Sequence, residues 1–146
     1  MNTVRHVLES KGREVYTVSA ESTIDDAVAK MCRVKVGALL VTGAAGDIAG
    51  VLSERDLLVR VLLAHRDPAK TTVEDVMTRK VVCIDEDNTI SGAMALMSRV
   101  RCRHLPVVRD GVVGMISMGD LARAASDDDE HELRVLHDYV EGRYPG

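Results

Sequence analysis

The sequence predicts a mixed α/β (α+β) fold, in which two tandem copies of one β-α-β-β-α unit pack sheet to sheet as a pseudo-two-fold pair, followed by a C-terminal helix. Three observations lead to this prediction. The chain repeats itself, each copy contains an apolar pattern of helical period, and each contains short β-rich runs separated by turn residues. Because a three-stranded unit is too small to stand alone, we expect the two copies to bury their sheets against each other.

The internal repeat emerges when the sequence is shifted by 66 residues, or by 64 residues after a turn in which the second copy lacks two. Apolar and polar positions match alike, so the copies share more than a hydrophobic pattern. The matched pairs include Thr23 with Thr89, Ile24 with Ile90, Met31 with Met97, Leu39 with Leu105, Gly50 with Gly114, Ser53 with Ser117 and Asp56 with Asp120.

The elements follow in the same order in each copy. In the first copy we expect a strand at 15–18, a helix at 24–34 that begins after Ser22 or Thr23, strands at 37–42 and 48–52, and a helix entered through 53–56. In the second copy the equivalents are 81–84, 90–100, 104–108, 112–116 and a helix entered through 117–120. Apolar residues at 4–8 and 73–77 predict a short helix leading into each copy.

These elements divide the chain into a first unit at 1–66, a second unit at 67–125, and an acidic linker with a C-terminal helix at 126–146. The polar segment 64–72 contains Pro68 and is typical of a connector. The last helix, at about 130–141, carries Leu133, Leu136 and Tyr139 on one side, and we expect it to support packing in a self-dimer.

Composition narrows the classes of function. The net charge of −4 and the absence of Phe and Trp argue against nucleic-acid binding, although residues 99–103 form a local basic cluster. No segment is apolar enough to span a bilayer and the N-terminus has no signal-peptide core, so we expect a cytoplasmic protein without membrane contact. Cys32, Cys83 and Cys102 form no CxxC pair, so we expect free, buried or half-buried thiols and no metal site.

The sequence resembles a CBS-domain pair, also called a Bateman module, over roughly residues 3–125. The motifs that carry the resemblance are the runs 50–56 (GVLSERD), 114–120 (GMISMGD) and 103–108 (RHLPVV). The tail at 136–142 is similar to the ending of stand-alone bacterial CBS pairs. The resemblance implies binding of AMP, ADP, ATP or NAD in the clefts between two CBS units, and a homodimer.

The hydroxyl–carboxylate pairs Ser53 with Asp56 and Ser117 with Asp120 are the leading candidates for a binding site. Each pair follows a strand and opens a helix. Asp56 and Asp120 would accept the two hydroxyls of a ribose, while the serine hydroxyls and helix amides would hold phosphate. Plain helix capping is the alternative explanation of the same residues.

Further candidates surround these pairs. For phosphate and other polar groups they are Arg55, Arg103, His104, Lys11 and Thr78. Arg55 stands opposite Gly119, and Arg103 and His104 opposite Gly37 and Ala38, so we expect two chemically unequal clefts. For adenine, the weaker candidates are Tyr16, Leu39, Val82, Leu105 and Pro106. Tyr16 is also a candidate core residue.

The sequence thus predicts a regulatory sensor that binds an adenine nucleotide and signals by a change of conformation, without catalytic residues or a catalytic cofactor. Its output would be read by a separate effector protein. Two alternatives come from other classes. One is a nucleotide-hydrolysing enzyme that uses Asp56 or Asp120, and the other is a nucleic-acid binder that uses residues 99–103.

Overall fold

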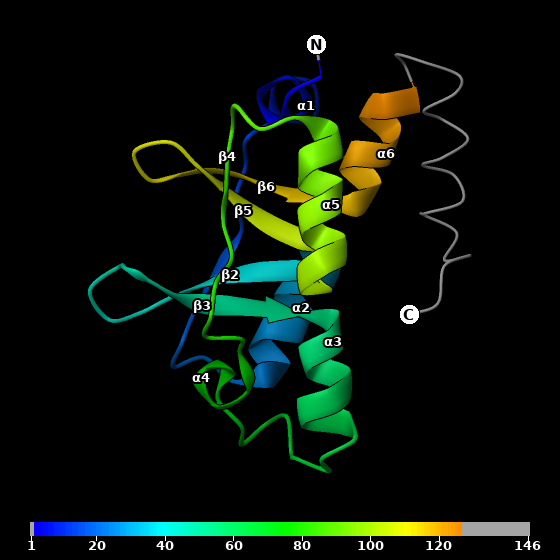
Figure 1. The fold of residues 1–146 in the computed structure, drawn as a ribbon. Helices are drawn as coiled ribbons and strands as arrows, with labels where there is room; N and C mark the ends of the chain where they lie inside the picture. Colours follow the sequence, from blue (N-terminus) through cyan, green and yellow to red (C-terminus); the bar gives the residue numbers. More distant parts are fainter. Residues whose placement is uncertain (1, 127–146) are drawn as a thin grey trace. The chain divides into compact units, whose positions relative to one another are not determined.

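A computed structural model describes residues 2–126, which form two three-stranded sheets with helices (Figure 1). These residues separate into two compact units. The first-repeat unit comprises residues 15–81, and the second-repeat unit comprises residues 2–14 together with 82–126. The predicted α+β class and the tandem repeat are confirmed. The predicted C-terminal helix at about 130–141 lies outside the described residues.

The first-repeat unit is built around the sheet β1-β2-β3. Strand β1 pairs parallel with β2, and β2 pairs antiparallel with β3. The elements are β1 (Thr17–Ser19), α2 (Ile24–Val34), β2 (Ala38–Thr42), β3 (Ile48–Ser53), α3 (Glu54–Asp56), the π-helical η1 (Leu57–Leu62) and α4 (Val73–Val76). Helix α3 continues directly into η1, so together they form the second helix that the sequence predicts.

The second-repeat unit has the same topology in the sheet β4-β5-β6. Its elements are α1 (Val4–Lys11), β4 (Ile84–Asp85), α5 (Ile90–Val100), β5 (His104–Val108), β6 (Val112–Ser117) and α6 (Met118–Ser126). Helices α2 and α5 both begin after a threonine cap, because Thr23 and Thr89 accept hydrogen bonds from the amides of Asp26 and Gly92. The two sheets also share an irregularity in register at the same place. The repeat therefore extends to local geometry.

The first strand of each copy is shorter than predicted and begins later. The expected strands at 15–18 and 81–84 are β1 (Thr17–Ser19) and β4 (Ile84–Asp85) in the structure. Only these residues lie in register with β2 and β5. Of the preceding residues in the first copy, Tyr16 contributes only its carbonyl, which accepts a hydrogen bond from the Leu40 amide at 3.1 Å.

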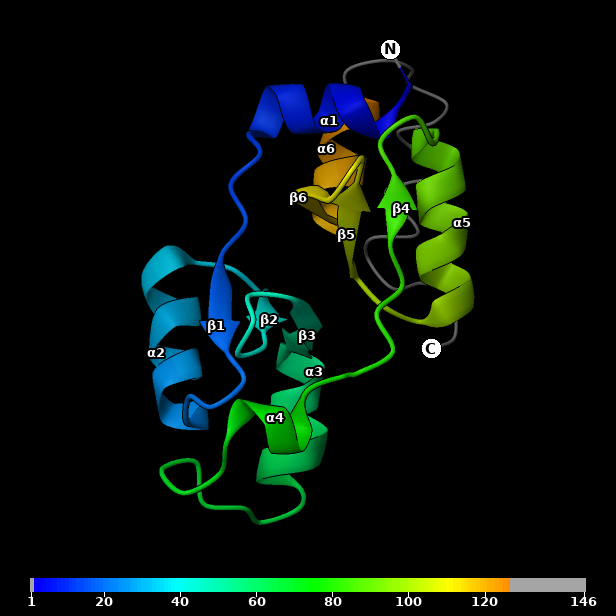
Figure 2. The same ribbon diagram turned by 90° about the vertical axis from the view of Figure 1, so that its left-hand side faces the viewer.

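The short helices α1 and α4 do not pack as the predicted boundary at 66/67 implies. That boundary assigns each helix to the copy that follows it, whereas α1 lies in the second-repeat unit and α4 in the first-repeat unit. The Val4 amide donates to the carbonyl of Asn88 at 2.8 Å, and the Val73 amide donates to that of Ser22 at 2.8 Å. Figure 2 shows α1 beside α6, with which it is in contact.

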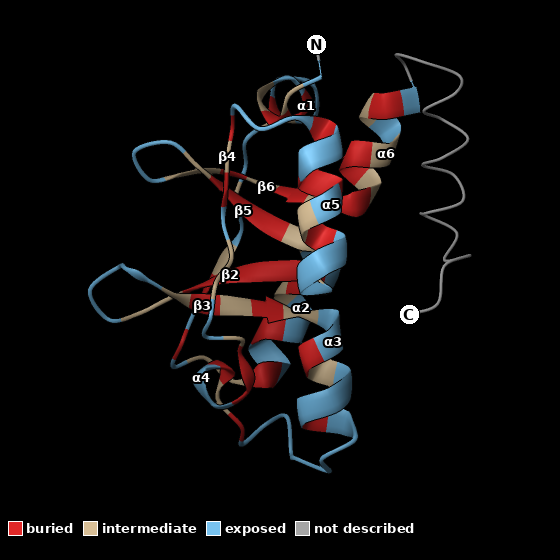
Figure 3. Cartoon of the chain, in the orientation of Figure 1, coloured by how far each residue is buried: buried red, intermediate tan, exposed pale blue. Residues whose placement is uncertain are grey.

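Each unit has its own apolar core (Figure 3). Val4 and Leu8 of α1 lie in the core of the second-repeat unit, and Val73 and Val76 of α4 lie in the core of the first-repeat unit. Burial of these apolar side chains removes the apolar face of each short helix from water, which explains why each helix packs on a core.

The repeated glycines Gly50 and Gly114 make room for neighbouring segments, which are the residues after α4 at Gly50 and helix α1 at Gly114. A Cβ at Gly50 would lie 2.6 Å from the carbonyl oxygen of Thr78, and a Cβ at Gly114 would lie 2.7 Å from Cδ2 of Leu8. At Gly50 the close atom belongs to the backbone, so a side chain would force the chain to shift, whereas at Gly114 the Leu8 side chain would have to move. Glycine at both positions thus allows the neighbouring segment to lie directly on the strand. Among residues 2–126, no helix combines the length and apolar character needed to cross a lipid bilayer.

Candidate functional site

In each unit we call the place where the last strand ends and the following helix begins the helix entrance. In the first-repeat unit this is the junction of β3 and α3, where Asp56 lies. Asp56 is 6% exposed. Oδ2 accepts hydrogen bonds from the Ser53 amide at 2.9 Å and the Ser53 hydroxyl at 3.1 Å. The Asp56 amide donates back to the Ser53 hydroxyl, which completes a capping box. Oδ1 accepts a hydrogen bond from the hydroxyl of Thr78 at 3.0 Å, and Nε of Arg60 lies 4.0 Å away.

The helix entrance of the second-repeat unit holds Asp120 in the same place, but with different partners. Its carboxylate is 7% exposed, and Oδ2 accepts from the Ser117 amide at 2.9 Å. The ammonium of Lys11 donates to the same Oδ2 at 2.7 Å and to the carbonyl of Met115 at 2.7 Å. Arg123 donates to Oδ1 at 2.5 Å. Two cations therefore hold the two oxygens of one carboxylate.

These contacts shift the acidity of Asp120. Burial by itself raises the pKa of the carboxyl group, but the hydrogen bonds from Lys11 and from the Ser117 amide, together with the charge of Lys11, lower it by more. The net result is a pKa of Asp120 below its ordinary value. The carboxylate is thus held in its charged form, which is the form that can accept two hydrogen bonds from a sugar diol.

The predicted polar residues fall into two groups, one at each entrance. Thr78 contacts Asp56, and Lys11 contacts Asp120, although the sequence predicts both as phosphate ligands. His104 pairs in register with Ser117, and the Arg103 carbonyl accepts a hydrogen bond from the Met118 amide. Their backbones therefore border the second entrance.

Arg55 and Arg103 both have exposed side chains. Arg55 lies in the first turn of α3, one residue before Asp56, and Arg103 immediately precedes β5. Each guanidinium is thus accessible to an anion beside its own entrance, and the phosphate roles of both stay predictions.

The predicted adenine residues lie in three environments. Leu39 and Leu105 are fully buried in the two cores, and Pro106 is also buried. Their side chains are therefore not available to a ligand in this structure, and their adenine roles stay predictions. Val82 is half-buried against the core of the second-repeat unit. Tyr16 is exposed just before β1, so the alternative interpretation of Tyr16 as a core residue is wrong.

Two arginines that touch the candidate carboxylates are missing from the sequence-based prediction. Arg123 follows Asp120 by three positions, and Arg60 follows Asp56 by four. Side chains at these spacings lie next to each other on a helix, so the signal was present in the sequence. Arg60 also donates to the backbone carbonyls of Val76 at 3.2 Å and Met77 at 2.9 Å, which ties η1 to the C-terminal end of α4.

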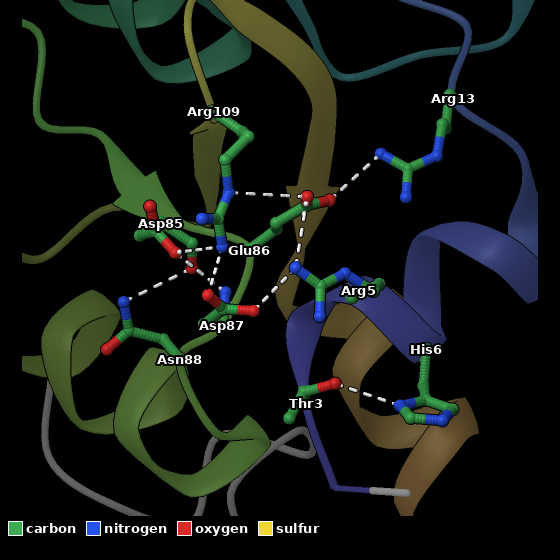
Figure 4. Close-up of polar contacts among 9 residues, drawn as sticks. All are labelled: Thr3, Arg5, His6, Arg13, Asp85, Glu86, Asp87, Asn88 and Arg109. Atoms are coloured by element: carbon green, nitrogen blue, oxygen red, sulfur yellow. Dashed lines mark hydrogen bonds and ion pairs between the residues drawn. The ribbon is translucent and has the colours of Figure 1, made fainter.

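A second ionic cluster of the second-repeat unit was not predicted from the sequence (Figure 4). Glu86 is 7% exposed and is surrounded by three arginines from separate segments. Arg5 of α1 lies 3.3 Å from Oε1, Arg13 lies 3.1 Å from Oε2, and Arg109 lies 3.5 Å from Oε1. Arg5 and Arg109 also pair with Asp87. The cluster therefore joins α1 and the residues after it to the β4–α5 turn.

The cluster predicts a pH-dependent contribution to stability. Burial raises the pKa of Glu86, but hydrogen bonds and charges from Arg13 and Arg5 lower it by more, so its pKa lies below the ordinary value in the folded state. A depressed pKa stabilises the fold above the unfolded pKa, about 4.3 for Glu, and this contribution is lost as the pH falls through the folded pKa.

We expect Glu86→Gln to lower the free energy of unfolding at pH 7. The difference in this free energy between wild type and Glu86→Gln should close below about pH 4. Urea denaturation of both proteins from pH 7 to pH 3 measures this gap; a gap that is constant with pH would contradict the assignment.

The cysteines differ from the prediction of buried or half-buried thiols. Cys102 is partly buried, and burial raises the pKa of its thiol, but Cys32 and Cys83 are exposed. Cys32 lies on the solvent side of the amphipathic helix α2. Within residues 2–126 no group of three His, Cys, Asp or Glu side chains is arranged to hold a metal ion.

Comparison with known proteins places both entrances inside a recognised domain. The CBS-domain family model matches residues 4–63 and 73–127. Each match ends beyond one entrance, so Asp56 belongs to the first matched region and Asp120 to the second. The two matches agree with the internal repeat, which was found without reference to any family.

Individual relatives agree with this match. A mitochondrial CBS domain-containing protein of Arabidopsis thaliana, CBSX3, is 35% identical over 97% of this chain and 73% of its own length. Another protein of that plant, CBSCBSPB2, is 29% identical over 84% of this chain but only 23% of its own length. A solved CBS-domain structure from Burkholderia ambifaria, to which signal transduction is ascribed, is 39% identical with a TM-score of 0.83 and covers 88% of this chain and 96% of its own.

Proposed function

The chain belongs to the family of CBS-domain proteins, a regulatory and signal-transduction family, and we propose that it is a sensor module that binds an adenine nucleotide. The ligand would be AMP, ADP, ATP or NAD. Binding shifts the module between conformations, and a separate effector protein reads the shift in the cytoplasm. The module itself carries out no reaction in this proposal.

The observation that carries the proposal is the repeated, buried carboxylate at each helix entrance. The Ser53 amide and hydroxyl fix Oδ2 of Asp56, while Oδ1 accepts a hydrogen bond from the Thr78 hydroxyl. This O–H···O⁻ bond is the kind of contact that a ribose hydroxyl makes with a carboxylate. A sugar diol can therefore take the place of one hydroxyl donor without leaving the buried charge unpaired.

Titration calorimetry with AMP, ADP, ATP and NAD, and with GMP as a control for the base, tests the proposal. We expect saturable binding of at least one adenine nucleotide. Absence of binding by all four would contradict it. The same mixtures, analysed for products after long incubation, distinguish a sensor from a hydrolase, because turnover that disappears in Asp56→Ala would favour the enzyme.

The proposal includes a homodimer, and the exposed apolar side chains along η1 support it. Leu58, Val59 and Leu62 are large apolar residues on the surface, and Leu62 is 69% exposed. Adjacent exposed apolar residues are typical of a protein–protein contact. We expect the wild-type protein to sediment as a dimer and Leu62→Glu as a monomer. Val28→Glu, at an exposed position on α2, is the control and should remain dimeric. A monomeric wild type, or a dimeric Leu62→Glu, would refute this contact.

A further inference from the structure

The two entrances are equivalent in backbone but not in the group that reaches the carboxylate. In the first-repeat unit, the Thr78 amide donates to the carbonyl of Val51 at 2.9 Å, and the Thr78 hydroxyl donates to Asp56. In the second-repeat unit, Met115 is the repeat equivalent of Val51. The ammonium of Lys11 donates both to the carbonyl of Met115 and to Asp120. Lys11 thus contacts the equivalent carbonyl and the equivalent carboxylate, but it donates to Oδ2, whereas the Thr78 hydroxyl donates to Oδ1.

This difference changes what each carboxylate can offer to a ligand. The Thr78 hydroxyl is neutral and can rotate, so it yields Oδ1 of Asp56 to an incoming hydroxyl at small cost. The Lys11 ammonium makes a charge-assisted bond of 2.7 Å to Oδ2 of Asp120, and Arg123 holds Oδ1. The Arg123 side chain is 74% exposed and can turn to solvent, whereas the Lys11 side chain is 32% exposed. Lys11 is therefore the cation that a neutral sugar diol must displace, and a hydroxyl group does not replace its charge beside the buried carboxylate.

We propose that Lys11 is a built-in competitor that closes the Asp120 entrance, so that each chain binds one nucleotide, at Asp56. This inference rests on the proposed function and names which of its two sites is used. The sequence predicts that Lys11 binds phosphate. In this proposal Lys11 instead opposes ligand binding at the Asp120 entrance.

Reciprocal substitutions between the repeats test the role of Lys11. We expect wild-type protein to bind one equivalent of AMP per chain, and Lys11→Thr to bind two. Lys11→Met keeps the length of the side chain without its charge, and it should also open the second site. In either background, Asp120→Asn should remove the added equivalent and leave the first. Urea denaturation establishes that each variant is folded before titration.

The converse change is made in the first-repeat unit. Thr78→Lys should lower AMP affinity by about tenfold or more, because it brings to Asp56 the kind of charge-assisted contact that Lys11 makes with Asp120. Thr78→Val removes the hydroxyl without adding charge, and it should cost less affinity than Thr78→Lys. A loss that is equal in the two variants would contradict competition by charge.

The outcomes separate this inference from the function on which it rests. If wild type and all variants fail to bind AMP, ADP, ATP and NAD, the proposed function is wrong. If wild type binds two equivalents with equal affinity, the function stands and the role of Lys11 is wrong. If Lys11→Met weakens binding or leaves one equivalent, Lys11 is not a competitor.

Discussion

Asp56→Asn is expected to weaken binding of AMP by about 10- to 150-fold while leaving the protein folded. Hydrogen bonds to a charged group contribute about 1.5–3 kcal/mol, and this change removes the charge and one acceptor oxygen. Asparagine can still accept from the Ser53 amide through its carbonyl oxygen, and its amide can donate to the Thr78 hydroxyl. The capping contacts that Asp56 makes in the structure therefore persist in a changed form.

The measurement is titration calorimetry with AMP on wild type and Asp56→Asn, with thermal unfolding to check the fold. Asp25→Asn removes an exposed carboxylate from the same unit and is the matched control. We expect Asp25→Asn to bind as wild type does. If Asp56→Asn binds AMP with wild-type affinity, Asp56 serves only as a helix cap. The capping box between Ser53 and Asp56 is the structural basis of that alternative.

Leu8→Ala is expected to lower the free energy of unfolding by about 2–5 kcal/mol, the largest effect on stability that we predict. Leu8 is 0% exposed and belongs to the core of the second-repeat unit. Its removal leaves a cavity beside Gly114, whose position has no side chain to fill the space. Glu9→Ala, at an exposed position on the same helix, should change stability by no more than about 0.5 kcal/mol.

Leu8→Ala also tests on which of the two cores α1 packs. Amide hydrogen exchange should lose more protection in β5 than in β2 for Leu8→Ala, because α1 packs in the second-repeat unit. The equivalent change Val73→Ala should affect β2 more than β5. Greater loss in β2 for Leu8→Ala would contradict the packing of α1 in the second-repeat unit.

Much of the fold could be predicted from the sequence, because the repeat displays each element twice. The helical period at 24–34 and 90–100 and the β-rich runs after them locate α2, α5 and the β2–β3 and β5–β6 pairs closely. The sequence does not show on which core α1 and α4 pack, for a physical reason. An apolar periodicity shows that a helix packs on a core, but two homologous cores offer equivalent surfaces, and the pattern does not distinguish them.

The candidate site shows a similar division. The pairs Ser53–Asp56 and Ser117–Asp120 are local, so the sequence predicts their position at the start of a helix. The contact between Lys11 and Asp120 joins residues 109 positions apart and depends on the packing of α1 in the second-repeat unit. No local pattern contains that information. The ionic cluster around Glu86 has the same origin, since Arg5 and Arg109 come from distant segments.

The central claim is that a buried carboxylate of this chain binds the hydroxyls of a ribose. Its most direct test compares AMP with 2′-deoxy-AMP in titrations of the wild-type protein, since the two ligands differ by a single hydroxyl. We predict that 2′-deoxy-AMP binds at least about tenfold more weakly, because one charge-assisted hydrogen bond to Asp56 is lost. Equal affinity for the two ligands would contradict the claim.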